Sequence, residues 1–336
     1  MKRATKIGVV GTAKNTGKTT TLLTIYEFLN LNKKKIIITG IGYDGEEIDN
    51  ITFLPKPRIK VNSGTIVATS ERLLTHFNIP FTLIEKSNIE NSLGMIVFAE
   101  INDESMVTVA GPTTLSGLKK FFMSNVVEQV DYVLVDGSIN RLSPLAIVDY
   151  LIFTTGFSRS ENLEQLAYEI KVIEDCFNLG IAFHSLDKNV PVIRNLISGD
   201  KIKNMAFNLS KIDMIKIEGV INGKVFIELL KSYGENKLII LDSPLTMIYS
   251  FTLNEILDLF SLVNKEKIHI AFENKPELLC ITINPSFPMF NGATYRLELK
   301  SSDTLKEKIS ERVNLPIFDV VKKRDYFFSF LSQKFD

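Results

Sequence analysis

The sequence predicts an α/β protein whose first domain is built on a parallel β-sheet. Short apolar and β-branched segments at residues 6–10, 35–39 and 131–136 are typical of strands that are buried on both faces. Between and after such segments, apolar residues recur at helical spacing, most clearly over residues 163–173. Strands that alternate with helices in this way predict βαβ units and a parallel sheet.

The composition is that of an ordinary globular protein. The chain has 336 residues, of which 45% are hydrophobic and 23% charged, so it can bury a core without cross-links. Lysine plus arginine equals aspartate plus glutamate, at 39 each, and we expect no nucleic-acid partner without a basic excess. The apolar run near the start spans only residues 7–10, and no run of about 18 apolar residues occurs. We expect a cytoplasmic protein that does not span a membrane.

Cysteine usage argues against a structural metal site. Cys176 and Cys280 lie far apart in the sequence, and neither has a metal-ligand spacing with any of the three histidines. His184 and His269 are isolated, and we find no catalytic constellation around them. Both cysteines are expected to be buried thiols in a reducing compartment.

A phosphate-binding loop is predicted directly after the first strand. Residues 11–19 read G-T-A-K-N-T-G-K-T, which we interpret as the phosphate-loop pattern G-x-x-x-x-G-K-[ST]. Helical spacing of apolar residues predicts a helix from about residue 17 to about residue 31. Glycines allow backbone N–H groups to curl around phosphates, and the helix N-terminus adds a positive end. The fold class predicted is therefore a parallel-sheet P-loop NTPase domain, rather than a glycine-rich turn without a ligand.

The loop residues have distinct expected roles. Lys18 would reach the β- and γ-phosphates, and the hydroxyl of Thr19 would bind Mg²⁺. One subclass of these ATPases has a signature lysine five residues before the loop lysine, but Ala13 occupies that position here. Lys14, one position away, either contacts phosphate or is a solvated loop residue. The residues expected to contact the nucleotide are Gly11, Thr12, Ala13, Lys14, Asn15, Thr16, Gly17, Lys18, Thr19 and Thr20.

Two aspartates follow predicted strands and are candidates for the metal side of the site. Ligands in such folds bind at the carboxyl ends of parallel strands. Asp136 would hold Mg²⁺, and the alternative is that it caps the next turn. Asp44 would hold a Mg²⁺-bound water or orient the attacking water, and the alternative is a solvated acidic turn. Arg141 and Arg159 also follow strand ends, where each either approaches a phosphate or lies on the surface.

Two domains are predicted. Residues 1–180 form the P-loop nucleotide-binding domain, in which residues 50–94, interrupted by prolines and glycines, are expected to be an insertion with a small sheet and one helix. Residues 181–336 again alternate strand-like and helix-like segments and are expected to form a second α/β region of unknown role.

Three segments carry a resemblance to known families. GTAKNTGKTTT, VLVDGSINR and IFTTGFSRS resemble the SIMIBI class of P-loop NTPases, which includes dethiobiotin synthetase, the molybdopterin-guanine dinucleotide adaptor and the MinD-type ATPases. The resemblance covers roughly residues 5–177. The same loop, with V-D-G followed by an arginine and a strand ending T-G-F, is similar to the smaller subunit of the lysine 5,6-aminomutase reactivase. That family would imply an ATP-driven chaperone, which acts with a MutS-like second subunit to release damaged cobalamin from an adenosylcobalamin-dependent aminomutase.

Three functions remain open from the sequence. The first is a Mg²⁺-dependent ATPase whose hydrolysis remodels or reactivates a protein partner, with a homo-oligomer also possible. The second is a dethiobiotin-synthetase-like ligase or kinase that phosphorylates a small molecule. The third is a non-hydrolysing, nucleotide-sensing adaptor. The guanine-reading pattern N-K-x-D is absent from the sequence, which favours ATP over GTP as the nucleotide.

Overall fold

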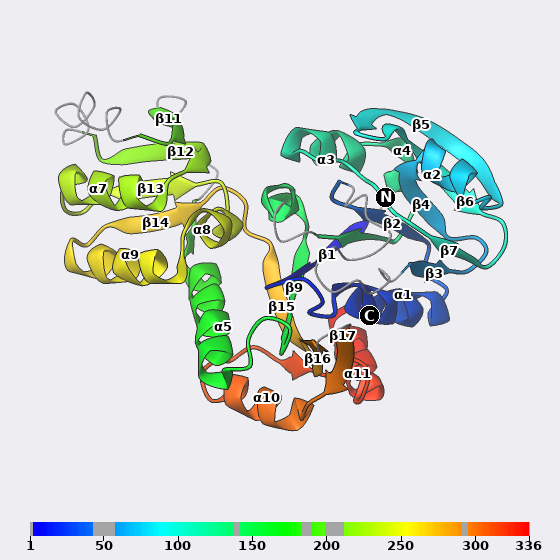
Figure 1. Cartoon of the computed structure of the whole chain (residues 1–336). Helices are drawn as coiled ribbons and strands as arrows, with labels where there is room; N and C mark the ends of the chain where they lie inside the picture. The colour runs from blue at the N-terminus through cyan, green and yellow to red at the C-terminus, as the bar shows by residue number, and fades with distance from the viewer. Residues whose placement is uncertain are drawn as a thin grey trace. The chain divides into compact units, whose positions relative to one another are not determined.

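The computed structural model describes residues 3–42, 58–137, 142–182, 190–198, 212–290 and 295–335. They divide into two compact units, of which unit 1 comprises Met1–Ala167 and Glu277–Asp336, and unit 2 comprises Tyr168–Pro276 (Figure 1). Unit 2 is thus an insertion in the sequence of unit 1. The predicted boundary at residue 180 is wrong for the C-terminal part of the chain, because residues 277–336 return to unit 1.

Unit 1 is built on a nine-stranded sheet with the order β18-β15-β9-β1-β8-β2-β4-β6-β5. Neighbouring strands from β18 to β4 are parallel, and β6 runs antiparallel to β4 and β5. The predicted α/β fold with a mainly parallel sheet is confirmed. The strands are β1 (Thr5–Gly11), β2 (Ile36–Gly40), β4 (Ile66–Ser70), β5 (Phe81–Asn91), β6 (Gly94–Ile101), β8 (Tyr132–Asp136), β9 (Tyr150–Gly156), β15 (Glu277–Asn284) and β18 (Ile317–Phe318).

Helices and two short two-stranded sheets complete unit 1. Strand β3 (Ile59–Val61) pairs with β7 (Ser105–Val107), and β16 (Ser286–Phe290) pairs with β17 (Tyr295–Leu299), both antiparallel. The helices are α1 (Lys18–Leu31), α2 (Glu71–His76), α3 (Leu115–Phe122), α4 (Asn125–Glu128), the 3-10 helix η2 (Ser143–Ile147), the start of α5 (Leu163–Asn178), α10 (Ser302–Ser310) and α11 (Arg324–Phe335). In the described parts of the chain, no helix is both long and apolar enough to cross a membrane.

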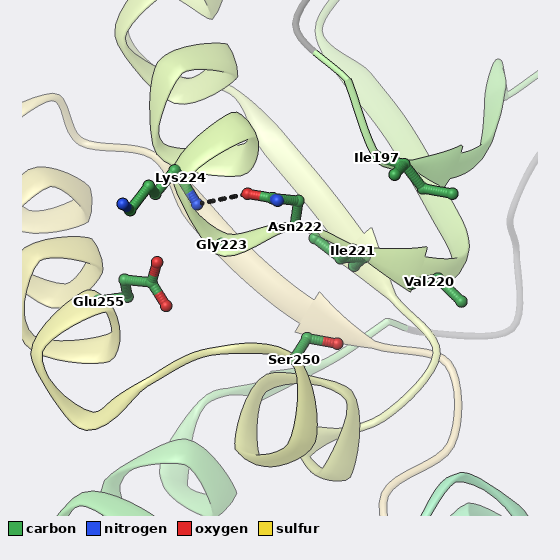
Figure 2. Close-up of a pocket in the computed structure, with 8 residues that line it drawn as sticks. All are labelled: Ile197, Val220, Ile221, Asn222, Gly223, Lys224, Ser250 and Glu255. Atoms are coloured by element: carbon green, nitrogen blue, oxygen red, sulfur yellow. Dashed lines mark hydrogen bonds between the residues drawn. The ribbon is translucent and has the colours of Figure 1, made fainter.

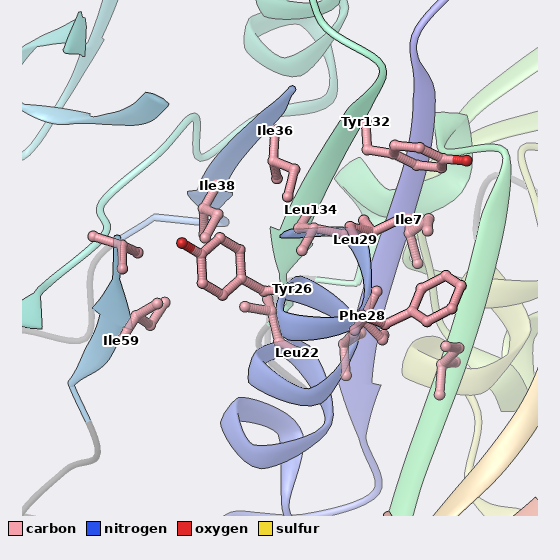
Figure 3. Close-up of a cluster of buried hydrophobic side chains, with 14 of the residues drawn as sticks. Ile7, Leu22, Tyr26, Phe28, Leu29, Ile36, Ile38, Ile59, Tyr132 and Leu134 are labelled. Carbon is pink, nitrogen blue, oxygen red and sulfur yellow. The ribbon is translucent and has the colours of Figure 1, made fainter. Parts of the chain in front are cut away.

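Helix α1 lies at the centre of an apolar core of unit 1. Its side chains Leu22, Ile25 and Leu29 are fully buried and belong to the same cluster as apolar residues of β1, β2 and β8 (Figure 3). Tyr26 is also buried, and its hydroxyl bonds Thr65 Oγ1 at 2.7 Å and accepts the N–H of Asn62 at 2.8 Å. A helix held on this many sides keeps its N-terminus in a fixed place relative to the sheet.

The last helix of the chain packs against the first. Phe328 of α11 lies 5.5 Å from Phe28 of α1 between ring centroids, and Phe327 and Leu331 of α11 are fully buried in the same core. Arg324 also forms an ion pair with Glu27 of α1. The C-terminal helix is therefore part of the support of α1.

The segment predicted as a small insertion instead extends the main sheet. β4 pairs in parallel with β2, and β6 and β5 follow as antiparallel neighbours. The one expected helix is present as α2, but only β3 lies in a separate small sheet. Residues 96–99 of β6 are buried in succession, and Val97 and Ala99 belong to the core of unit 1, so both faces of this strand are covered as in a strand inside a sheet. Residues 50–57 lie outside the described part of the chain.

Unit 2 is a smaller α/β unit with its own core. Its five-stranded sheet is entirely parallel, in the order β10-β14-β13-β12-β11. Its elements are the rest of α5, β10 (Gly180–Ile181), β11 (Val192–Leu196), β12 (Met214–Ile221), α7 (Gly223–Tyr233), β13 (Leu238–Leu241), α8 (Pro244–Ser250), α9 (Leu253–Lys265) and β14 (His269–Phe272). The thiol of Cys176 is buried in this core and that of Cys280 in unit 1, and burial raises the pKa of each.

Carboxylates gather at the carboxyl end of the unit 2 sheet. Lys216 on β12 forms ion pairs with Glu218 at 2.7 Å and Glu273 at 2.9 Å. Asp242, directly after β13, accepts the N–H of Gly219 at 3.3 Å. Burial raises the pKa of Asp242 and outweighs the Gly219 N–H and the Lys216 charge, which lower it, while the charges of Glu218 and Glu273 raise it further. Because the folded-state pKa lies above the unfolded one, folding is favoured when Asp242 is protonated, and this contribution is lost as pH rises through the folded-state pKa.

Asp242→Asn should therefore raise the thermal midpoint of unfolding at pH 7. The increase over the wild type should be smaller at pH 4. The amide removes the buried charge, and its oxygen still accepts the Gly219 N–H. Thermal unfolding of wild type and variant between pH 4 and 8 measures the difference. Asp258→Asn, on the exposed face of α9, controls for removal of a surface charge. A gain for Asp242→Asn that is larger at pH 4 than at pH 7 would contradict the expectation.

Candidate functional site

The predicted P-loop connects the central strand of unit 1 to its central helix. β1 ends at Gly11 and α1 begins at Lys18, so residues 12–17 make the whole connection. β1 lies between β8 and β9, and both pair with it in parallel. The carboxyl ends of three strands therefore meet at the loop, which is the position where parallel sheets bind ligands. This β1–loop–α1 unit on a parallel sheet is that of a P-loop NTPase fold.

The spacing of the motif requires a correction. Five residues separate Gly11 from Gly17, whereas the pattern G-x-x-x-x-G-K-[ST] allows four. Counted back from Gly17, the first position of the pattern is Thr12, so the first glycine of the pattern is replaced. The part of the motif that this chain keeps is G-K-[ST], with Lys18 and Thr19 in the first turn of α1.

Gly11 still has a structural reason to be a glycine. A Cβ at this position would lie 2.3 Å from Thr16 Oγ1, 3.0 Å from Lys18 Cγ and 3.0 Å from Thr154 Oγ1. The side chains of Thr16 and Lys18 therefore occupy the space above Gly11. The glycine lets the loop fold back over the end of β1.

The loop backbone contains two residues in the left-handed region. Asn15 has a φ of 60°, and Gly17, which caps the N-terminus of α1, has a φ of 92°. Asparagine tolerates this region better than most residues, and glycine adopts it freely. These two positions turn the chain from the strand into the helix.

Side chains of β9 hold the loop against the sheet. Thr12 donates its N–H to the carbonyl of Thr154 at 2.9 Å, and its hydroxyl donates to Thr155 Oγ1 at 3.0 Å. Thr16, which is buried, pairs with Thr154 Oγ1 at 2.9 Å and donates to the carbonyl of Ala13 at 3.0 Å. Both ends of the loop are thus bonded to one strand.

The N-terminus of α1 suits an anion. No side chain caps its first turn, and no acidic residue lies within that turn. The first helical bond runs from the N–H of Thr21 to the carbonyl of Gly17 at 2.9 Å. The backbone N–H groups before Thr21 belong to the positive end of the helix, where phosphate is stabilised. Lys18 and Thr19 are half-buried here, and Lys14 and Thr20 are exposed.

Asp136 lies at the same edge of the sheet. It is the last residue of β8, where it is aligned with Val9 of β1 and Gly40 of β2. Its carbonyl accepts the N–H of Ile41 at 2.9 Å, and the residue as a whole is half-buried. Asp136 therefore lies near the carboxyl end of β1, on the same edge of the sheet as the loop. This is the strand-end position that the sequence predicts for it.

The Thr19 hydroxyl and the Asp136 carboxylate are oxygen ligands of the kind that Mg²⁺ prefers. They are too few to hold a metal ion without further ligands from phosphate or water. In the described residues, no group of three or more His, Cys, Asp or Glu side chains could hold a metal ion. A threonine hydroxyl and a carboxylate at a phosphate-binding loop are the protein ligands that Mg²⁺ needs when phosphate and water supply the rest.

The remaining predicted site residues are placed as follows. Asp44 and Arg141 lie outside the described residues. Arg159 is exposed in the turn after β9, where its N–H bonds the carbonyl of Gly156 at 2.9 Å. This turn adjoins the P-loop, because Ser158 donates to the carbonyl of Asn15 at 3.0 Å.

Several loop-contacting residues escaped the sequence analysis. Thr154 and Thr155 directly precede Gly156, the last residue of β9, and Thr282 and Asn284 lie among the last three residues of β15. Thr282 pairs with Thr21 of α1 at 2.8 Å between hydroxyl oxygens, and Asn284 donates to the carbonyl of Asn15 at 2.7 Å. The signal that could have found them is the polar end of an otherwise apolar strand, T-T-G in one case and T-I-N in the other.

Unit 2 contains a cavity of about 390 Å³ at the start of α7 (Figure 2). Asn222 accepts the N–H groups of Lys224 at 3.1 Å and Val225 at 3.3 Å, which caps the helix. A Cβ on Gly223 would lie 2.8 Å from Glu255 Oε2, so a carboxylate of the chain itself already lies at this helix end. Such a carboxylate opposes a phosphate ligand. The cavity is lined by Ile197, Val220, Ile221, Asn222, Gly223, Lys224, Ser250 and Glu255.

Comparisons with known proteins add little beyond the fold. No family model and no curated protein matches this chain. It is similar to the MinC:MinD cell division protein complex of Aquifex aeolicus at 14% identity, over 83% of this chain and 81% of that chain, with a TM-score of 0.24. It is also similar to the signal recognition particle receptor FtsY of Elizabethkingia anophelis at 10% identity, over 91% and 64% of the two chains, with a TM-score of 0.20. At these TM-scores the fold assignment rests on the strand order and the loop of this chain.

Gly11→Ala should destabilise the protein by about 1–3 kcal/mol, the usual cost of forcing atoms into a packed site. The new methyl group would meet Thr16 Oγ1 and break its bond to Thr154. Chemical denaturation measures the change in unfolding free energy. Gly180→Ala is the matched control, because its Cβ would meet no atom closer than 3.7 Å. Equal effects of the two substitutions would show that the space above Gly11 is not needed.

Proposed function

We propose that this chain binds Mg²⁺-ATP at the loop between β1 and α1 and hydrolyses it. The observation that carries the proposal is the meeting of three features at one sheet edge. These are the left-handed turn at Gly17, the uncapped N-terminus of α1 with Lys18, and Asp136 at the end of the neighbouring strand. The loop amides and Lys18 would hold the phosphates, because both offer positive charge where the triphosphate is negative.

Thr19 and Asp136 would hold the Mg²⁺ ion. A hydroxyl and a carboxylate are both oxygen donors that this ion prefers. Mg²⁺ bound beside the phosphates neutralises the charge that develops there during hydrolysis. Asp44, which follows β2 in the sequence, is proposed to orient the attacking water. That assignment is supported by the alignment of Gly40, the last residue of β2, with Asp136.

We further propose that ATP hydrolysis remodels a protein partner. Unit 2 has a core of its own and is inserted between β9 and β15, and both of these strands end in residues that bond the P-loop. A unit connected to two such strands can transmit a conformational change of the P-loop to a bound protein. The resemblance to an aminomutase reactivase makes a cobalamin-dependent aminomutase the first partner to test, together with a second reactivase subunit.

A small-molecule substrate is the second candidate. Lys14 and Arg159 are both exposed, one in the loop and one beside it, and such cations would suit an anionic substrate. Phosphate release that rises with a small carboxylate or carbamate, and with no protein added, would favour a ligase or kinase of the dethiobiotin-synthetase type. A rate of ATP hydrolysis that neither protein partners nor small molecules raise would favour a nucleotide-sensing adaptor.

Thermal unfolding with a nucleotide panel tests the binding site. ATP with Mg²⁺ at 100 times its dissociation constant should stabilise the wild type by about 2.7 kcal/mol, and Lys18→Ala should abolish this gain. GTP should stabilise less than ATP at equal concentration. Lys35→Ala removes an exposed lysine before β2 and should respond to ATP as the wild type does. No shift with any nucleotide in the wild type would refute nucleotide binding by this chain.

Asp136→Asn should raise the Mg²⁺ concentration needed for half-maximal ATP binding by about tenfold. The amide keeps the shape of the side chain but loses the charge that favours the ion. A Mg²⁺ titration followed by calorimetry measures the midpoint. Asp149→Asn is the control, since Asp149 accepts the N–H of Lys6 at 2.8 Å and pairs with no P-loop residue. An unchanged midpoint in Asp136→Asn would remove Asp136 from the metal site.

A further inference from the structure

Two side chains, one at the end of β15 and one in the turn after β9, converge on one carbonyl of the P-loop. Asn284 Nδ2 donates to the carbonyl oxygen of Asn15 at 2.7 Å, and Ser158 Oγ donates to the same oxygen at 3.0 Å. We propose that Asn284, assisted by Ser158, is a positioning residue that holds the P-loop in its phosphate-binding conformation. The proposal rests on the proposed nucleotide site, and it adds a residue that the loop motif does not contain.

Asn284 is itself held in one orientation. Its Oδ1 accepts the N–H of Ser286 at 3.1 Å, which leaves the NH₂ group to face Asn15. As the last residue of β15, Asn284 is also aligned with Gly156 of β9, where a Cβ would lie 2.2 Å from the Asn284 carbonyl oxygen. The backbone of Asn284 is held by the sheet and its side chain by Ser286. The side-chain NH₂ group can therefore hold the loop in one conformation.

The geometry of the peptide group explains what this bond does. In a trans peptide the C=O and the N–H point in opposite directions. Because the Asn15 carbonyl points to Asn284, the N–H of Thr16 points away from Asn284, and we infer that it faces the phosphates. If this peptide turned over, a carbonyl oxygen would replace the N–H and repel phosphate. Asn15 has a φ in the left-handed region, which non-glycine residues adopt only at some cost. The hydrogen bond from Asn284 therefore stabilises this orientation of the Asn15–Thr16 peptide.

Packing restricts the loop at the same place. Asn284 Cβ lies 3.2 Å from the position that a Cβ on Gly17 would take. Asn284 therefore bonds the carbonyl of Asn15 and also occupies the space that a side chain at position 17 would need.

Ser158 is the weaker of the two donors. Its hydroxyl has one proton but lies within bonding distance of two acceptors, the carbonyl of Asn15 at 3.0 Å and that of Ser286 at 3.1 Å. The proton is shared between the loop and the first residue of β16. Removal of Ser158 should therefore cost less phosphate affinity than removal of Asn284.

The test compares a nucleotide with a ligand that has phosphates and no base. Calorimetry would give the dissociation constants of Mg²⁺-ATP and Mg²⁺-tripolyphosphate for the wild type, Asn284→Ala and Asn284→Leu. We expect both ligands to bind about fivefold more weakly to each variant, the factor for one hydrogen bond, and about twofold more weakly to Ser158→Ala. Leucine is close to asparagine in shape, so agreement between the two Asn284 variants excludes a cavity as the cause.

The control is a second asparagine that makes the same kind of bond elsewhere. Asn32 Nδ2 donates to the carbonyl of Phe28 at 2.8 Å, at the far end of α1. Asn32→Ala should change the unfolding midpoint but neither dissociation constant. Circular dichroism would establish that each variant is folded before binding is measured.

The outcomes distinguish failure of the positioning role from failure of the proposed nucleotide site. If Asn284→Ala and Asn284→Leu weaken ATP but leave tripolyphosphate unchanged, Asn284 acts on the nucleoside and the positioning role is wrong. If neither ligand is weakened, the bond to Asn15 does not hold the loop. If the wild type binds neither ligand, the nucleotide site itself fails and this role fails with it.

Discussion

The reversal of the backbone between β1 and α1 is the constraint on which the rest of the site depends. A strand that ends at Gly11 and a helix that begins at Lys18 leave residues 12–17 to turn the chain. Left-handed conformations at Asn15 and Gly17 make this turn possible without a longer loop. The short connection brings the amides of the helix N-terminus to the end of the central strand. A longer connection would have separated the positive helix end from the neighbouring strand ends.

Local sequence patterns predict the features of the site that lie close together in the chain, but not its contacts between distant residues. The strand, the loop, the helix and the place of Asp136 follow from patterns within a few residues and from the general rule that parallel strands end at one edge. The pattern counted back from Gly17 begins at Thr12 and not at Gly11, and the nucleotide contacts of the loop residues remain predictions. Asp44 remains a prediction. Thr154 and Asn284 were missed, because a hydrogen bond between residues far apart in sequence leaves no periodic signal.

The domain division shows the same limit. Strand-like segments were expected within residues 181–336, and one of them is β15, in which residues 279–283 are buried. An apolar strand does not reveal its partner, so the pairing of β15 with β9 of unit 1 could not be predicted from composition. The same holds for β4 and β5, which lie within the predicted insertion at residues 50–94 but join the main sheet. The parallel sheet itself was predicted because alternation of strands and helices is a property of the whole segment.

The insertion of unit 2 also sets an order of events during synthesis. The ribosome makes β1, α1, β8 and β9 first, then the whole of unit 2, and only afterwards β15, β18 and α11. Until β15 emerges, β9 is the outer strand of the growing sheet on that side, with backbone groups open to other strands. Unit 2 can meanwhile assemble its core, since domains generally fold as units from the N-terminus. Thr282, which pairs with α1, and Asn284, which bonds the P-loop, therefore arrive late in translation. In a nascent chain stalled within unit 2, the loop would be held by β9 and the turn after it, without the bond from Asn284.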